Sequence, residues 1–585
     1  MKKTKIVGTM GPATQSKKVM VDLLHAGMNV ARFNFSHGDQ ASQLNHINLF
    51  KEARQEAGVI AGILLDTKGP EIRTHKMEHN GILLEKGHKI RIAMTEVLGS
   101  ADKFSITYEG LIDDVTIGSL ILIDDGLIEL EVEAIDDQAK EIACVVVNSG
   151  VLKSQKGINV PGISLNIAGI TEKDKQDIRF GARQDVDFIA ASFVRRQNDV
   201  MEIRAILEEE NKTNIKIISK IENRQGVDNI DEIIEVSDGI MVARGDLGVE
   251  VPTEDVPLIQ KMIIKKCNRA GIPVVTATQM LDSMQRNPRP TRAEAGDVAN
   301  AIFDGTDAVM LSGETAAGDY PLEAVKMMAK ICERTESQLL GQDAFTLKKF
   351  NQSDLTEAIG QAVGHTARNL GIQTIVAATS SGYTARMIAK YRPSSNILAA
   401  TFEEEAQRSL TLVWGVQPFV IGKPDSTDEM LDSASAMAVR QGFAKEGDLI
   451  IITAGVPVGE KGTTNIMKIQ LIGTKLAEGQ GVGSGNFIGK AVIAHTAEEA
   501  NAYVKEDTVL VTSQTDRDYT PALERVGAII CESGGITSHA AIFGLERGIP
   551  VVVAVEGAME AIKQNELITV DARRGIIYRG ATVSI

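Results

Sequence analysis

The stretch IKIISKIENRQG, residues 215–226, contains the pattern that decides the fold. It begins as a buried strand, because four of its first seven residues are isoleucines. Lys220 and Glu222 interrupt this run, and side chains two positions apart in a strand lie on one face. A solvated ion pair is the simplest explanation. It is weakened because the flanking run is apolar and buried charges need partners.

Seven further apolar runs occur in the first 315 residues, separated by amphipathic helical stretches. The eight runs are KIVGTMG (5–11), NVARFNF (29–35), AGILLDT (61–67), FIAASFV (188–194), KIISKIE (216–222), GIMVAR (239–244), PVVTAT (273–278) and AVMLS (308–312). Short strands that alternate with helices indicate parallel βαβ units. Eight such units predict an α/β fold, a closed (β/α)8 TIM barrel.

Each run ends in polar residues or leads directly into them. These residues are Thr9, Asn34, Ser36, Asp66, Thr67, Ser192, Lys220, Glu222, Arg244, Asp246, Thr278 and Ser312. In such barrels the catalytic residues lie at the carboxyl ends of the strands. A polar residue at one strand end can simply mark where the strand stops. Carboxylates, cations and hydroxyls that converge from eight strands favour an active site for polyphosphates.

About 120 residues, 68–187, separate the third run from the fourth, where about 30 would suffice for a βαβ unit. The segments SLILIDDGLIELEVEAID (119–136) and EIACVVVNSG (141–150) alternate apolar with polar residues, and Asp-Asp-Gly marks a turn. They predict a small β-barrel domain over residues 69–168, inserted into a barrel domain of residues 1–68 and 169–341. A domain inserted at the active-site end can act as a lid.

Glu222 and Asp246 are candidate ligands for Mg²⁺ (or Mn²⁺), which takes one or two protein carboxylates and completes its shell with substrate and water. Gly245 and Asp246 lie where a strand gives way to a helical turn, whose free backbone N–H groups can hold an anion. Lys220 could neutralise a phosphoryl group during its transfer. Two further cations suited to phosphate are Arg32 and Arg73.

A second cluster of oxygen-bearing side chains follows the second and third runs. Its members are Asn34, Ser36, Asp66 and Thr67. Two hydroxyls, an amide and a carboxylate could hold a monovalent cation. Ordinary strand-end hydrogen bonding is the alternative, and the spacing alone favours it.

Six long motifs resemble those of the pyruvate kinase family and occur in that family's order. They are ARFNFSHG, LDTKGPEIRT, ISKIEN, MVARGDLGVE, TATQMLDSM and PTRAEAGDVANAIFDGTDAVMLSGETAAGDYP. The resemblance extends from about residue 4 to residue 475. It implies transfer of a phosphoryl group from phosphoenolpyruvate to ADP, which gives pyruvate and ATP in the last step of glycolysis. It also implies a cytoplasmic homotetramer that uses magnesium and potassium.

The resemblance carries roles over to individual residues of the barrel. It implies that Lys220 stabilises the transferring phosphoryl group and the enolate, and that Arg32 holds the phosphate. Glu222 and Asp246 would bind the magnesium ion.

Other residues of the same motifs would act at the carboxylate and the enolate. The Gly245 and Asp246 amides, with Thr278, would hold the carboxylate. Thr278 would lie near the proton donor for the enolate, and the proton would pass through water and Ser312.

The resemblance also assigns the remaining cations and oxygens. Asn34, Ser36, Asp66 and Thr67 match a potassium site, and Glu71 matches a glutamate that accompanies potassium dependence in this family. The nucleotide-side positions are Arg73, His37 and Lys156, and the last comes from the inserted domain.

A new alternation of strands and helices predicts an open α/β domain over residues 342–476. Its strands are expected at 374–379, 397–401, 417–422 and 448–455. The loop TSSGYT (379–384) is a candidate phosphate nest, and in relatives of this family it binds a phosphorylated activator. The residues concerned are Thr379, Ser380, Ser381, Gly382 and Thr384. An ordinary strand–helix turn is the alternative.

Residues 477–585 form an extension that begins with a glycine-rich stretch, EGQGVGSG (478–485), read as a linker or first turn. GAIICESGGITSHAAIFGLERGIPVVVAV (527–555) resembles the swivelling phosphohistidine domain, of β/β/α type, of phosphoenolpyruvate synthase and pyruvate phosphate dikinase. His539 occupies the phosphohistidine position. No segment resembles the ATP-grasp domain that normally charges this histidine. We therefore expect a structural or regulatory role before phosphotransfer.

Composition and net charge exclude several classes of function. The 585 residues carry a formal net charge of −16, which argues against non-specific nucleic-acid binding. The four cysteines form no C-x-x-C pair, and no apolar run reaches the length of a membrane span. Two alternatives to a pyruvate kinase are a dikinase-like phosphotransferase that uses His539 and a non-catalytic sensor. The sensor is disfavoured because the expected site residues are all present.

Overall fold

The computed structural model describes residues 2–79, 81–339, 355–455, 464–473, 475–483 and 485–580. The chain divides into two units. The first comprises Met1–Gln352, Ser380–Arg392 and Thr401–Val420, and the second comprises Ser353–Thr379, Pro393–Ala400 and Ile421–Ile585. The predicted boundary at 341/342 lies outside the described residues.

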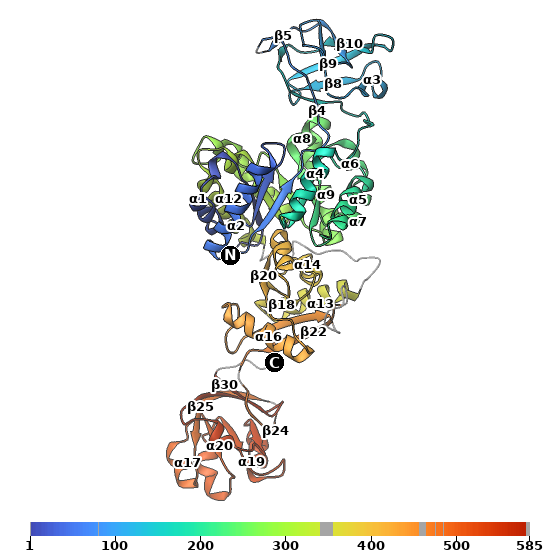
Figure 1. The fold of residues 1–585 in the computed structure, drawn as a ribbon. Coiled ribbons are helices and arrows are strands. Elements are labelled where there is room, and N and C mark those ends of the chain that lie inside the picture. Colours follow the sequence, from blue (N-terminus) through green and yellow to red (C-terminus); the bar gives the residue numbers. More distant parts are fainter. Residues whose placement is uncertain are drawn as a thin grey trace. The chain divides into compact units, whose positions relative to one another are not determined.

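The first unit is built on the predicted closed barrel of eight parallel strands (Figure 1). The strands are β1 (Lys5–Thr9), β2 (Val30–Asn34), β3 (Gly62–Asp66), β13 (Phe188–Ala191), β14 (Lys216–Ile221), β15 (Gly239–Ala243), β16 (Val274–Ala277) and β17 (Ala308–Leu311). Around the barrel they follow the order β1-β17-β16-β15-β14-β13-β3-β2. All eight lie at the predicted runs, which confirms the alternation of strands and helices that the sequence indicated.

Helices surround this barrel and cover its apolar outer face. They are α1 (Lys17–His25), α2 (Gln40–Ala57), α4 (Glu172–Arg183), α5 (Gln197–Glu209), α6 (Arg224–Asp228), α7 (Ile230–Val236), α9 (Val256–Ala270), α10 (Arg292–Asp304) and α12 (Pro321–Leu339). At the start of two of these helices, side-chain oxygens accept hydrogen bonds from free backbone N–H groups. Thr171 and Thr291 form capping boxes with the third residue of α4 and α10. Two short helices, α8 (Arg244–Glu250) and α11 (Gly313–Ala316), directly follow β15 and β17.

The segment between β3 and α4 contains nine strands and one short helix, α3 (Leu111–Asp114). Its strands are β4 (Ile72–Arg73), β5 (Ile82–Leu84), β6 (Lys89–Ala93), β7 (Lys103–Ser105), β8 (Leu120–Ile123), β9 (Ile128–Asp136), β10 (Glu141–Val146), β11 (Gly150–Leu152) and β12 (Gly157–Asn159). They form a seven-stranded sheet, β4-β12-β8-β9-β10-β6-β7, and the pair β11-β5. Asp124, Asp125 and Gly126 have positive φ between β8 and β9, as a tight hairpin requires.

The first unit also contains α14 (Tyr383–Ala389), α15 (Glu404–Ser409) and β20 (Val416–Val420). Two arginines, the buried Arg392 and the partly buried Arg408, fix these elements to the amino-terminal end of the barrel. Arg392 pairs with Asp307 at 2.9 Å, and Arg408 pairs with Asp187 at 2.8 Å. Both aspartates precede a barrel strand and also accept a backbone N–H from a neighbouring strand.

The second unit contains a mainly parallel sheet and a larger carboxyl-terminal sheet. The first includes β18 (Thr374–Ala378) between β19 (Asn396–Thr401) and β21 (Leu449–Gly455), with β22 (Thr464–Leu471) antiparallel to β21. Its helices are α13 (Leu355–Asn369) and α16 (Thr427–Arg440).

The carboxyl-terminal sheet has eight strands in the order β23-β30-β29-β25-β26-β27-β28-β24. They are β23 (Lys475–Glu478), β24 (Gln480–Val482), β25 (Asn486–Ile493), β26 (Thr508–Thr512), β27 (Ala528–Cys531), β28 (Val551–Val553), β29 (Leu567–Asp571) and β30 (Ile576–Arg579). The accompanying helices are α17 (Ala497–Tyr503), α18 (Thr520–Leu523), α19 (His539–Arg547) and α20 (Ala558–Ala561).

The prediction of a linker in the stretch EGQGVGSG was wrong. Its first residues belong to β23 and β24, and β24 pairs antiparallel with β28. Two of the glycines reflect a close backbone approach, because a Cβ on Gly479 would lie 2.3 Å from the carbonyl oxygen of Val553 and one on Gly481 would lie 1.9 Å from that of Ala572. Among the described residues, no helix is long and apolar enough to cross a membrane.

Candidate active site

The mouth of the barrel is organised around one buried carboxylate, that of Asp66 at the end of β3. Its Oδ2 accepts a hydrogen bond from Arg32 Nε at 2.5 Å. Its Oδ1 accepts from Lys220 Nζ at 3.1 Å and lies 3.3 Å from Ser192 Oγ. Burial alone would raise the pKa of Asp66, but the adjacent Arg32 and Lys220 outweigh it and hold that pKa below its usual value.

The Lys220 ammonium has three oxygen atoms within 3.1 Å. It donates to Asp66 Oδ1 and, at 2.8 Å, to Ser192 Oγ, and it pairs with Glu222 Oε1 at 3.0 Å. Burial opposes the charge on Lys220, yet the Asp66 and Glu222 carboxylates raise its pKa above the usual value. Ser192 in turn donates to the carbonyl of Thr67 at 2.7 Å, so this hydroxyl is fixed as an acceptor for the lysine.

Glu222 lies with Lys220 on one face of β14, as the spacing predicted. Its second oxygen, Oε2, accepts the backbone N–H of Phe193 at 2.6 Å. Phe193 has φ of 55°, a conformation uncommon for a non-glycine residue. Burial raises the pKa of Glu222 to about 7, against the lowering effect of Lys220. The charged form of Glu222 is therefore disfavoured by burial, and a further cation beside it would stabilise that form.

A second group of predicted residues lies at the ends of β15 and β16. The Gly245 N–H donates to Thr278 Oγ1 at 2.8 Å, and this hydroxyl donates to the Ala277 carbonyl at 2.7 Å. Thr278 and Gln279 have φ of 64° and 52°. A β-branched residue in the left-handed region is strained, and such strain persists only where neighbouring contacts enforce it. Here Arg244 supplies one such contact by donating to the Thr278 carbonyl at 2.6 Å.

Ser312 follows β17, and its hydroxyl is buried without a hydrogen-bond partner among the described residues. A buried donor left without a partner is costly, so the group needs a ligand or a water molecule. Its backbone N–H is bound to Glu314 Oε2 at 2.7 Å.

The inserted domain and the barrel enclose a cavity of about 510 Å³. Among the predicted residues, Glu71, Arg73, Lys156 and Asp246 line it, whereas His37 is exposed and does not. Two cations of this cavity are paired: Arg73 Nε with Glu71 at 2.7 Å and Lys156 Nζ with Asp124 at 2.8 Å. Other lining residues include Asn159, Leu165, Ile167, Phe193, Arg195, Asn223, Gln225 and Glu250.

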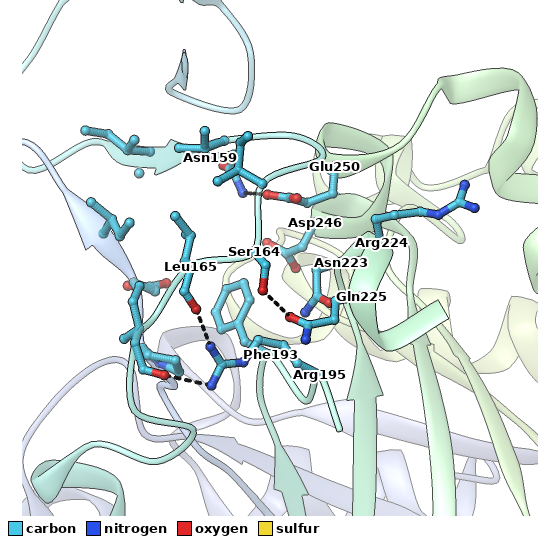
Figure 2. Close-up of a pocket in the computed structure, with 18 of the residues that line it drawn as sticks. Asn159, Ser164, Leu165, Phe193, Arg195, Asn223, Arg224, Gln225, Asp246 and Glu250 are labelled. Atoms are coloured by element: carbon cyan, nitrogen blue, oxygen red, sulfur yellow. Dashed lines mark hydrogen bonds between the residues drawn. The ribbon is translucent and has the colours of Figure 1, made fainter. Parts of the chain in front are cut away.

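Several residues that hold this cavity together were not predicted. Figure 2 shows Arg195 donating to the carbonyl of Leu165, and a second bond reaches Ile167 at 2.9 Å. Asn159 of β12 donates to Glu250 of α8 at 2.9 Å (Figure 2). Arg195 follows the end of a barrel strand, so the sequence could have indicated it as a site residue. Nothing in the sequence indicates that Asn159 contacts Glu250.

Two carboxylates, Glu222 and Asp246, are available for a divalent cation. No group of three or more histidine, cysteine, aspartate or glutamate side chains suited to a metal occurs in the described part of the chain. A two-carboxylate donor set fits Mg²⁺, whose remaining ligands are substrate oxygens and water. It does not fit a closed structural metal site.

The potassium candidates lie on adjacent strands, since Asn34 and Asp66 are paired in the register of β2 and β3. Part of the set is already bound. Asn34 Oδ1 accepts the Ser36 N–H at 3.0 Å, and the Thr67 hydroxyl donates to the Ala190 carbonyl at 3.3 Å. Strand-end hydrogen bonding thus accounts for some of these side chains. The hard oxygens of the set also fit a monovalent cation.

The loop at 379–384 combines features of an ordinary turn with a left-handed glycine. The Thr379 N–H donates to the Ala400 carbonyl at 3.0 Å. Gly382, with φ of 80°, precedes the first turn of α14. Ser380 and Ser381 are partly exposed, whereas Thr384 is buried.

In the carboxyl-terminal sheet region, His539 is the first residue of α19 and is partly exposed. Its Nδ1 lies 3.0 Å from Thr515 Oγ1. The neighbouring Ser538 hydroxyl is buried without a partner in the part of the chain that the structure describes. Hydrogen bonding at Nδ1 leaves Nε2 as the nitrogen available for other contacts.

Comparison with known proteins identifies the family. The profile "Pyruvate kinase, barrel domain" matches residues 1–325, "Pyruvate kinase, alpha/beta domain" matches 357–470, and "PEP-utilising enzyme, mobile domain" matches 504–575. The pyruvate kinase of Geobacillus stearothermophilus is 59% identical over 580 residues, and that of Staphylococcus aureus (strain MRSA252) is 55% identical over 584 residues. Both alignments cover 99% of each chain.

A crystal structure of a pyruvate kinase from Cryptosporidium parvum superposes with a TM-score of 0.76 at 40% identity. The match covers 80% of this chain and 96% of that chain. The barrel and these matches define a phosphotransferase. The chain belongs to the pyruvate kinase family, in the form that carries a PEP-utilising-enzyme domain at its carboxyl-terminal end.

Proposed function

We propose that the chain transfers the phosphoryl group of phosphoenolpyruvate to ADP, giving pyruvate and ATP in the last step of glycolysis in the cytoplasm. The observation that carries this proposal is the buried Lys220, held between Asp66 and Glu222 at the barrel mouth. Phosphoryl transfer depends on positioning and charge neutralisation more than on covalent help. A fixed, fully charged lysine beside two carboxylates suits that task.

Lys220 donates to Asp66 and Ser192 and forms an ion pair with Glu222, and a phosphoryl oxygen would take the place of one of these three oxygens. Glu222 is the acceptor that leaves, because its other oxygen faces only a backbone N–H and it is a proposed magnesium ligand. Mg²⁺ (or Mn²⁺), held by Glu222 and Asp246, would supply positive charge at the phosphate and the enolate oxygen. Arg32 stays on Asp66 and presents its remaining guanidinium edge to the phosphate.

The carboxylate of the substrate is assigned to the Gly245 and Asp246 amides and to Thr278. The Gly245–Thr278 hydrogen bond places the two groups side by side, and the carboxylate would have to displace it to accept the Gly245 N–H. The proton for the enolate is assigned to water near Thr278 and Ser312. The unpartnered Ser312 hydroxyl supports this, since it can accept from and donate to such a water.

The nucleotide phosphates are assigned to Arg73, Lys156 and His37. Arg73 and Lys156 line the cavity under the inserted domain, which supports their part in the assignment. This domain, residues 69–168, would act as a lid and keep bulk water from the enolate until the enolate is protonated.

Family membership supports a proposal for the domains and the wider assembly. We assign residues 1–68 and 169–341 to the barrel domain, 342–476 to the α/β domain and 477–585 to the extension. The protein would act as a homotetramer. The loop with Thr379, Ser380, Ser381, Gly382 and Thr384 would bind a phosphorylated activator, and the left-handed Gly382 supports a backbone turned toward an anion.

Replacing Lys220 with methionine should abolish turnover, because the transferring phosphoryl group loses its fixed cation. The loss should reach about 10³-fold or more. A coupled assay with phosphoenolpyruvate, ADP, Mg²⁺ and K⁺ measures it, with circular dichroism as the check on folding. Lys212→Met, which removes a surface ion pair, is the matched control and should keep full activity. Unchanged turnover in Lys220→Met would refute the assigned role.

The potassium assignment predicts that activity requires K⁺, through Asn34, Ser36, Asp66 and Thr67. Glu71→Lys should remove most of this requirement, because a lysine there brings its own positive charge toward the cavity that Glu71 lines. Rates in K⁺-free and K⁺-containing buffer measure the effect, and Glu78→Lys, on an exposed position of the inserted domain, is the control. Full wild-type rate without K⁺ would rule the assignment out.

A dikinase-like relay through His539 is the second candidate, favoured by the Thr515 contact that leaves Nε2 available. The extension is expected to be structural or regulatory, so incubation with labelled phosphoenolpyruvate should leave no acid-labile phosphate on the chain. Phosphate that appears on the wild type and on His495→Ala, but not on His539→Ala, would establish the relay instead.

A further inference from the structure

Thr9, the last residue of β1, makes a contact that the proposed function does not use. Its hydroxyl oxygen accepts a hydrogen bond from Arg32 Nη1 at 3.0 Å. The two residues are partners in the parallel register of β1 and β2, so their side chains lie on the same face of the barrel. Thr9 is 4% exposed, which keeps water from competing for this bond.

A second contact of the same hydroxyl fixes the direction of this hydrogen bond. Thr9 Oγ1 donates its proton to the Leu311 carbonyl of β17 at 2.9 Å. A hydroxyl group has one proton and two lone pairs, so toward Arg32 this oxygen is an acceptor. The Thr9 backbone is held as well, because its carbonyl accepts from the Thr315 hydroxyl at 2.9 Å. Thr9 therefore presents a preset acceptor to Arg32.

The Arg32 guanidinium is consequently held at two different nitrogens. Asp66 accepts from Nε at 2.5 Å, and Thr9 accepts from Nη1. One contact would leave the planar group free to pivot, whereas two contacts at different nitrogens fix its plane. Within the described residues nothing accepts from Nη2, so the N–H groups of Nη2 remain available for a ligand.

A purely structural hydrogen bond is the alternative role for Thr9, since buried polar groups are normally partnered. However, Asp66 already supplies the opposite charge that Arg32 needs in its half-buried position. A valine would fill nearly the same volume as Thr9 and would leave that ion pair in place. The hydroxyl therefore adds direction to the guanidinium more than it adds stability to the fold.

We propose that Thr9 is the positioning residue for Arg32 and sets how tightly the site binds the phosphate of its substrate. By accepting from Nη1, it holds the guanidinium in the orientation in which the remaining N–H groups reach the phosphate oxygens. Thr9 acts through Arg32 and does not itself touch the substrate. The inference rests on the proposed function, in which Arg32 holds the phosphate of phosphoenolpyruvate.

Replacing Thr9 with valine removes the acceptor and keeps the shape of the side chain. We expect KM for phosphoenolpyruvate to rise about tenfold, because Arg32 loses its orientation. The value of kcat should stay within about threefold, because Arg32 binds the phosphate in the ground state and the transition state alike. A coupled assay of the full chain with ADP, Mg²⁺ and K⁺ measures both constants.

Pyruvate separates this role from a general loosening of the barrel mouth, because it has no phosphate for Arg32 to bind. Its inhibition constant against phosphoenolpyruvate should change by less than about twofold in Thr9→Val. A merely structural defect would weaken the binding of both ligands together. The ratio of the two constants is therefore the decisive quantity.

Two further variants complete the comparison. Thr9→Ser keeps the hydroxyl and should retain KM for phosphoenolpyruvate within about threefold of wild type. Thr306→Val is the matched control: its buried hydroxyl, just before β17 at the opposite end of the barrel, bonds to the carbonyls of Val274 and Ala308. This variant should lose stability without changing the ratio of the two constants.

If Thr9→Val does not fold, Thr9→Ala takes its place. An unchanged KM for phosphoenolpyruvate in the folded variant would overturn the inference, and so would an equal weakening of pyruvate. The same loss in Thr9→Ser would overturn it too, because the hydroxyl would then not be responsible. All three outcomes leave the proposed reaction standing, whereas a wild type that does not turn over phosphoenolpyruvate would refute that reaction.

Discussion

The buried carboxylate of Asp66 is the interaction on which the rest of the barrel mouth depends. It pairs with Arg32 and Lys220 at once and fixes both cations at the ends of β2 and β14. Burying a charge without a partner is strongly unfavourable in free energy, so none of the three groups could occupy this place alone. Under the proposed function, this arrangement would keep positive charge preorganised for a phosphate, which is where enzymes gain most from electrostatics. Glu222 would then be the partner that Lys220 exchanges.

The fold was predictable because the barrel repeats one pattern. Each strand is short and apolar, and each ends in a polar residue or leads directly into one, so eight weak signals combined into a strong one. Lys220 and Glu222 could be placed on one face from their spacing alone, and the structure confirms their contact at 3.0 Å. The hairpin at Asp124–Gly126 was equally readable, because a tight turn requires particular backbone angles.

Contacts between distant segments could not be read in the same way. The pairing of Lys220 with Asp66 joins residues 154 positions apart, and no local pattern predicts such a partner. Asn159 meets Glu250 only after the inserted domain has folded over α8. Gly481 of β24 was misread because flexibility and close backbone approach select the same residue.

The central claim is that Lys220 exchanges Glu222 for the phosphoryl group. Calorimetric titration of phosphoenolpyruvate into the wild type and Glu222→Gln, with and without Mg²⁺, tests it most directly. Without metal, the variant should bind about tenfold more tightly than wild type, because its lysine has a freed donor and faces one carboxylate fewer. With metal the order should reverse, because a magnesium ligand is lost. Weaker or equal binding by the variant without metal would contradict the claim.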